Sequence, residues 1–226
     1  MGKKLSCALG IVTLLMISAV NYLIFIWVPA EKAMGIVQKI FYFHVAAAWV
    51  GFFAFFIVFT AGIKYLFSSK AKWDWFSAAS AEIGFVFMTI VLITGAVWGR
   101  AFWGHWWTWD PRLTTSLILW FIYAAYLLLR SGITERARRA RYSAVLGIIG
   151  FIDVPVVWFS VSWWRTLHPN LMGEGGQLAI STKMSITLTF SVIAFTALYG
   201  LLLSRVVKLY RLDDEIQRTK EMIRMM

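Results

Sequence analysis

Six stretches of this 226-residue chain are long and apolar enough to cross a lipid bilayer as helices. A helix needs about 20 mostly apolar residues to span the hydrocarbon core, where open strand edges are not tolerated. The expected spans are residues 5–28, 41–67, 75–97, 113–130, 142–163 and 178–207. The sequence therefore predicts an all-α polytopic membrane protein, a bundle of six transmembrane helices in one integral-membrane domain over residues 1–226.

The distribution of lysine and arginine predicts how this bundle is oriented. Six spans place both termini on one side; if that side is the cytoplasm, 16 of the 22 basic residues are cytoplasmic, as the positive-inside rule requires. Residues 208–226 then form a cytoplasmic tail, either continuing the last helix or lying as a short surface helix. The net charge of +11 is accounted for by loops that contact anionic membrane lipid, and no nucleic acid partner is expected.

The most unusual composition lies in residues 98–112, the predicted outer loop between the third and fourth spans. Four tryptophans fall within seven residues there: Trp103, Trp106, Trp107 and Trp109. Single tryptophans commonly anchor proteins at membrane interfaces. A dense run of tryptophans that includes Gly104 could also bind a flat apolar ligand, through ring stacking and the burial of apolar surface. Composition alone leaves both interpretations open.

Asp110 and Pro111 close the tryptophan run. Aspartate is favoured as the N-cap of a helix and proline at its first position, so this pair predicts the start of the fourth helix. Arg112 has two candidate partners, the carboxylate of Asp110 and an anionic group on a ligand. The sequence does not choose between them.

All three histidines of the chain, His44, His105 and His168, fall on the predicted outer side. Neutral imidazole is a common axial ligand of haem iron, which makes His44 and His168 candidate ligands beside the aromatic loop. Trp163 and Trp164 add aromatic surface just before His168. His105 lies inside the tryptophan run and is not expected to be a ligand.

The remaining chemistry is sparse. Glu82 and Asp153 lie within spans, where acids are functional candidates, although a buried neutral acid or a polar pair is the preferred account. Pro155 is expected to kink the fifth span. The single cysteine, Cys7, excludes an internal disulfide, and no Cys-x-x-Cys-His segment is present for covalent haem. With no nucleotide-binding signature, any use of ATP requires a partner.

Three segments resemble those of a known family. Residues 103–110 (WGHWWTWD) fit the WGxxWxWD pattern of tryptophan-rich haem-handling proteins, which include the cytochrome c maturation proteins C and F and the CcsA-type haem lyases. Residues 43–49 (FHVAAAW) and 160–168 (SVSWWRTLH) resemble the two histidine segments of the CcmC family. The similarity covers nearly the whole chain. The family commonly has proline two residues after the first histidine, where this chain has Ala46; the departure affects the start of the helix and leaves the ligand in place.

The resemblance implies a bacterial inner (plasma) membrane protein that binds b-type haem non-covalently at the periplasmic face. It implies that His44 and His168 ligate the iron and that the macrocycle is held by a larger set: Trp103, Gly104, Trp106, Trp107, Trp109, Asp110, Trp163 and Trp164. CcmC proteins deliver haem to the periplasmic chaperone CcmE during c-type cytochrome biogenesis. They work beside the ATP-driven CcmA–CcmB complex and the small membrane protein CcmD.

Three alternatives stay open at this point. A cytochrome c haem lyase of the same superfamily is usually longer, with more histidines and spans. A haem transporter across the bilayer would need an intramembrane polar path, for which only Glu82 and Asp153 are available. A structural subunit would use its tryptophans only as interfacial anchors. We expect a haem transfer protein, and its status as an enzyme is left open.

Overall fold

The computed structural model describes residues 3–32, 34–169 and 180–225, and within these ranges every regular element is helical. The elements in chain order are α1 (Lys3–Tyr22), the π-helical turn η1 (Leu23–Trp27), the 3₁₀ turn η2 (Ile36–Lys39), α2 (Ile40–Ser68), α3 (Ala71–Trp103), α4 (Pro111–Gly132), α5 (Arg136–Phe151), α6 (Asp153–Trp163) and α7 (Thr182–Met225). Six helical segments are long and apolar enough to cross a membrane. The predicted all-α fold with six long apolar helical segments is confirmed.

The spans differ from the predicted ones mainly at their ends. The fifth span is two helices, α5 and α6, which break at Ile152 because Pro155 has no N–H to donate to the preceding turn. The helix α3 continues to Trp103, so the predicted loop 98–112 begins with helix. The last helix begins at Thr182 and continues unbroken to Met225 through the predicted tail. The predicted third outer loop, residues 164–177, and the predicted span start at 178 lie partly outside the described residues.

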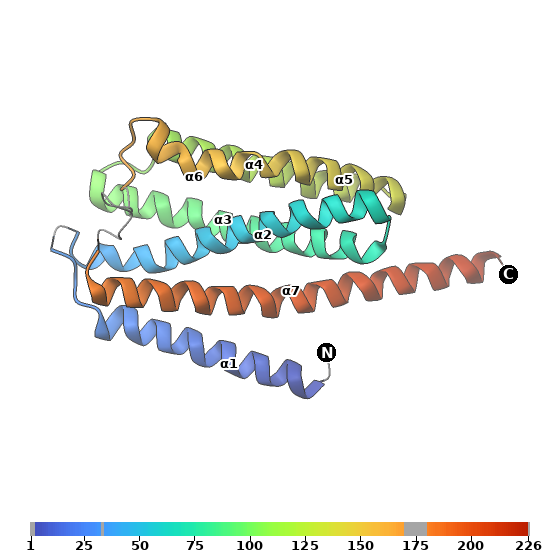
Figure 1. Cartoon of the computed structure of the whole chain (residues 1–226), viewed down its shortest axis with the longest axis horizontal. Helices are drawn as coiled ribbons and strands as arrows, with labels where there is room; N and C mark the ends of the chain where they lie inside the picture. The colour runs from blue at the N-terminus through green and yellow to red at the C-terminus, as the bar shows by residue number, and fades with distance from the viewer. Residues whose placement is uncertain (1–2, 33, 170–179, 226) are drawn as a thin grey trace.

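The bundle is built around α2, which packs against α3, α5 and α7. In Figure 1, α2 and α3 lie in the middle, with α4, α5 and α6 on one side and α7 and α1 on the other. Small residues bring the central helices together: a Cβ at Gly84 of α3 would lie 2.6 Å from the ring of Phe55 on α2. The ring of Phe55 in turn stacks on Tyr123 of α4, with centroids 3.5 Å apart.

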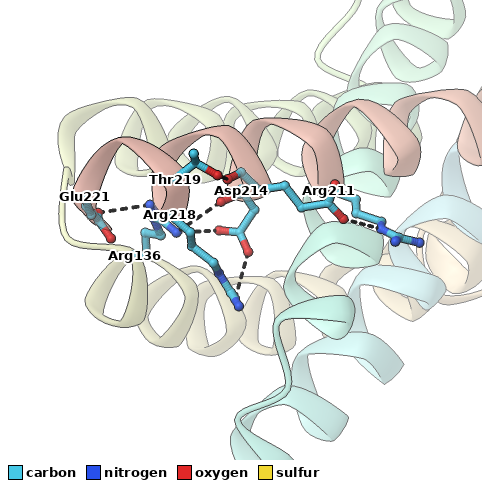
Figure 2. Close-up of polar contacts among 7 residues, drawn as sticks. Arg136, Arg211, Asp214, Arg218, Thr219 and Glu221 are labelled. Atoms are coloured by element: carbon cyan, nitrogen blue, oxygen red, sulfur yellow. Dashed lines mark hydrogen bonds and ion pairs between the residues drawn. The ribbon is translucent and has the colours of Figure 1, made fainter. Parts of the chain in front are cut away.

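Both chain termini lie at the same end of the bundle (Figure 1). At this end the last turns of α7 are tied to the start of α5, since Arg136 forms ion pairs of 3.0 Å with Asp214 and Glu221. Figure 2 shows these contacts together with Arg218, which reaches the same Asp214. We call this the arginine end. The opposite end carries His44, His105 and His168 and is called the histidine end.

Candidate functional site

His44 is buried near the start of α2, and its ring is held by α3. Its Nδ1 lies 2.9 Å from Oγ1 of Thr94, and the Thr94 hydroxyl donates its proton to the carbonyl of Ile90 at 2.7 Å. Because that single proton is used, Thr94 accepts the N–H of His44 Nδ1. This assigns the tautomer, and the lone pair of Nε2 is free to bind a metal.

Gly95 gives the His44 ring its space. A Cβ at this position would lie 3.2 Å from Cε1 of His44, and the edge of Trp98 meets the same ring at a centroid distance of 5.9 Å. Thr94 and Gly95 were not among the predicted site residues. A signal was present: a Thr-Gly pair inside an apolar span, where glycine costs about 1 kcal/mol relative to alanine, indicates a close approach.

His168 lies in the segment after α6. Its unprotonated ring nitrogen is Nε2, as in His44. Its Nδ1 is 3.2 Å from the carbonyl oxygen of Pro169. A carbonyl only accepts, so Nδ1 carries the proton and Nε2 keeps its lone pair. Burial, together with repulsion from the Arg112 cation, lowers the pKa of His168 to about 4. The ring is therefore neutral at pH 7, the form that binds metals.

Asp110 joins the tryptophan loop to the segment that carries His168. Its buried carboxylate accepts from the backbone N–H of Arg112 at 2.9 Å, which confirms the predicted N-cap of α4. It also accepts from Thr166 Oγ1 and from the backbone N–H of Leu167, both at 2.7 Å. Thr166 Oγ1 accepts from the backbone N–H of His168 at 3.0 Å. One carboxylate therefore fixes both the start of α4 and the position of His168.

Two cavities meet at the histidine pair. One has a volume of about 50 Å³ and the other a volume of about 400 Å³. Five residues line both: His44, Ala48, Phe52, Arg112 and His168. The smaller cavity is walled by Trp98, Trp103 and Trp107, and the larger by Trp49, Trp158 and Phe159. The two rings thus border one site with aromatic walls on either side.

Arg112 reaches α6. Its Nη1 donates to the carbonyls of Val157 at 2.6 Å and Trp158 at 3.1 Å, and its side chain borders both cavities. The Asp110 carboxylate, one of the partners considered from the sequence, accepts from the backbone N–H of Arg112 and not from its guanidinium. It acts as a bridge between α4 and α6 at the level of the histidines.

The tryptophans predicted to hold the macrocycle divide into two groups. Trp103 and Trp107 are partly buried and face the smaller cavity. Four others line neither cavity and are exposed: Trp106 at 60%, Trp109 at 76%, Trp163 at 56% and Trp164 at 49%.

Gly104 ends α3 in a left-handed conformation with φ 79°, a conformation that glycine adopts without strain. Its carbonyl accepts a hydrogen bond from Arg100. His105 is exposed and borders neither cavity.

The two intramembrane acids lie outside both cavities. Glu82 accepts a hydrogen bond from the hydroxyl of Tyr210, the polar pair preferred from the sequence. Asp153 begins α6, and its Oδ2 is buried without a hydrogen-bond partner among the described residues.

Comparison with known proteins gives a consistent assignment. The family model described as CcmC, heme exporter protein C, matches residues 1–224. Heme exporter protein C of Bradyrhizobium diazoefficiens is 36% identical over 76% of this chain, and the matched part spans 65% of that relative's length. The Escherichia coli K12 protein of the same name is 36% identical over 83% of this chain and 74% of its own. A putative cytochrome c biosynthesis ccmC-like mitochondrial protein of Marchantia polymorpha is 34% identical over 80% of this chain and 78% of its own. With nearly its whole length matched by the family model, the chain belongs to the CcmC family, heme exporter protein C.

Proposed function

We propose that this protein binds haem between His44 and His168 at the outer face of the membrane and delivers it to a haem chaperone of the CcmE type. The observation that carries the proposal is the pair of histidine rings. They come from different elements, each has Nε2 unprotonated, and both border the same two aromatic cavities. Imidazole nitrogens bind haem iron, and aromatic walls bind a flat macrocycle.

A second feature of the site fits the same ligand. The indole Nε1 of Trp98 is buried without a hydrogen-bond partner in the described residues, and this side chain borders the smaller cavity. A buried donor without a partner is unfavourable by about 1–3 kcal/mol. An acceptor group on a bound ligand would satisfy it, and the two propionates of haem are such acceptors.

The orientation in the membrane supports delivery to the outside. The arginine end carries both termini and most of the basic residues, and the positive-inside rule places such an end in the cytoplasm. The histidine end then faces the periplasm or cell exterior. The proposed partners are CcmE as acceptor, and CcmA, CcmB and CcmD as the ATP-driven complex beside this protein. The protein's part is to bind and orient the haem.

The two groups of tryptophans predict separable defects. Trp103→Ala and Trp107→Ala are expected to lower haem occupancy, because these rings wall the cavity. Trp106→Ala and Trp109→Ala are expected to keep occupancy and lower transfer, since their exposed rings are available to a docking partner. Absorbance measures occupancy, and haem staining of the chaperone measures transfer. Unchanged transfer in the Trp106 and Trp109 variants would leave these two rings with only an anchoring role.

Thr94→Val tests the assigned tautomer of His44. The substitution keeps the shape of the side chain and removes the acceptor for Nδ1–H. Loss of such a partner typically lowers metal affinity about 10–100-fold, and we expect a loss of this order for haem with a shifted Soret band. Thr89→Val is the matched control, because Thr89 lies on the same helix and pairs with Trp120 instead. Wild-type affinity in Thr94→Val would contradict the tautomer assignment.

A further inference from the structure

The larger cavity extends away from the histidine pair along the side of the bundle. Apart from Arg112 of α4 and the segment after α6, its lining residues come from three helices. They include Val45, Trp49 and Phe52 of α2, Phe159 and Ser162 of α6, and Val192 of α7. On α2 these positions follow a helical spacing of three or four residues, so they share one face. From His44 to Phe52 this face descends eight residues, about 12 Å at 1.5 Å per residue.

The position of these helices shows where the cavity opens. The central helix α2 packs against α7, and α6 packs against α4 and α5, whereas no extensive packing joins α6 to α7 within residues 153–163 and 182–225. In Figure 1, α2 lies between α6 and α7. The cavity is therefore a cleft with α2 as its floor and α6 and α7 as its walls. Three of its lining side chains, Trp49, Trp158 and Phe159, are exposed, which places its opening on the lateral surface of these helices.

The surroundings of the cleft are apolar. All three helices belong to segments that are long and apolar enough to span a membrane. The side chains at the margin are large and partly exposed: Trp49 at 46%, Trp158 at 53% and Phe159 at 44%. The hydrocarbon half-thickness is about 15 Å, so a cleft about 12 Å deep faces the acyl chains of the leaflet at the histidine end.

We propose that this cleft is a lateral passage through which haem moves between that leaflet and the histidine pair. The inference rests on the proposed function, which supplies haem as the ligand. A flat, mostly apolar macrocycle dissolves in the hydrocarbon, and a passage lined by aromatic and aliphatic side chains keeps its ring out of water. Transfer to an aqueous partner then uses the other side of the site, past Trp103 and Trp107.

Val192→Trp is the test, because it fills the cleft from the α7 wall away from the histidines. Ile193→Trp is the matched control: the neighbouring side chain is 49% exposed and lies outside the cleft. The full-length protein is reconstituted in vesicles whose bilayer contains dissolved haem, and growth of the shifted Soret band of histidine-ligated haem is followed. Loading of Val192→Trp is expected to slow about tenfold or more, while Ile193→Trp loads like wild type.

A cleft that only conducts haem and a cleft that contacts bound haem predict different effects of Val192→Trp on rates and affinity. Narrowing a passage slows loading from the bilayer and release into it equally, so the dissociation constant stays constant. Transfer from preloaded Val192→Trp to an aqueous haem acceptor is expected at the wild-type rate. Ser162→Trp, which fills the cleft from the α6 wall, is expected to behave like Val192→Trp and guards against a local folding defect.

Two outcomes would overturn the passage while leaving the histidine site intact. One is loading of both tryptophan variants at the wild-type rate. The other is weaker binding with faster release, which would make Val192 and Ser162 contacts of bound haem. Failure of the proposed function itself is distinguishable, since the wild-type protein would then leave the Soret band of the bilayer haem unshifted.

Discussion

The double substitution His44→Ala and His168→Ala is expected to abolish haem binding by the purified protein. Both rings present an unprotonated Nε2 to the same site, and their removal leaves the iron without a protein ligand. Each single substitution is expected to weaken binding by at least about tenfold, or about 1.4 kcal/mol. It should also convert a six-coordinate spectrum into a five-coordinate one. The measurement is the Soret band of protein purified after expression with haem available.

The third histidine provides the matched control. His105→Ala changes an exposed ring of the same end that borders neither cavity, so its spectrum and affinity are expected to equal those of wild type. A wild-type spectrum in the double variant would show that the axial ligands lie elsewhere. External imidazole added to His168→Ala should restore the six-coordinate spectrum, because it occupies the position of the missing ring.

Asp110→Asn is expected to weaken haem binding without removing any ligand. The carboxylate accepts three hydrogen bonds, from Arg112, Thr166 and Leu167, and an amide has only one acceptor oxygen. At least one buried N–H then loses its partner, which destabilises the fold by about 1–3 kcal/mol. The released segment no longer holds His168, so we expect partial five-coordinate haem in absorbance and a lower thermal unfolding midpoint.

Imidazole separates a positioning role for Asp110 from direct contact with the ligand. If the carboxylate acts through His168, external imidazole restores the six-coordinate spectrum of Asp110→Asn as it does for His168→Ala. If Asp110 touches the haem itself, as the resemblance implies, imidazole leaves the affinity low in a folded variant. Thr166→Val is the graded control, since it removes one of the three bonds and leaves the other two.

Much of this architecture was predictable because it depends on local composition. Length and apolarity predict the six helices, Pro155 predicts the break between α5 and α6, and the Asp110-Pro111 pair predicts the start of α4. The end of α3 was harder to predict from the sequence. Helix α3 continues through Trp98 to Trp103, since amphipathic tryptophans are compatible with both helix and loop at an interface.

The functional division of the tryptophans was not predictable from the run itself. Trp103 and Trp107 face a cavity whereas Trp106 and Trp109 are exposed. The composition of the run does not distinguish these four tryptophans from one another. Their directions depend on the left-handed turn at Gly104 and on how Asp110 anchors the loop. Trp158 and Phe159 were missed for a related reason: in the sequence they look like ordinary residues of an apolar span, and only the packing of α6 brings them to the site.

The sequence by itself determined the fold class, the family and the end of the bundle at which the histidines lie. Each of these follows from the period and length of apolar runs, or from segments that are contiguous in the chain. The tertiary structure alone decided which nitrogen of each histidine is free, which residue holds His168 in place and where the cavities open. These depend on contacts between residues far apart in the chain, 50 positions for His44 with Thr94 and 56 for Asp110 with Thr166, and such pairs are set by how the helices pack.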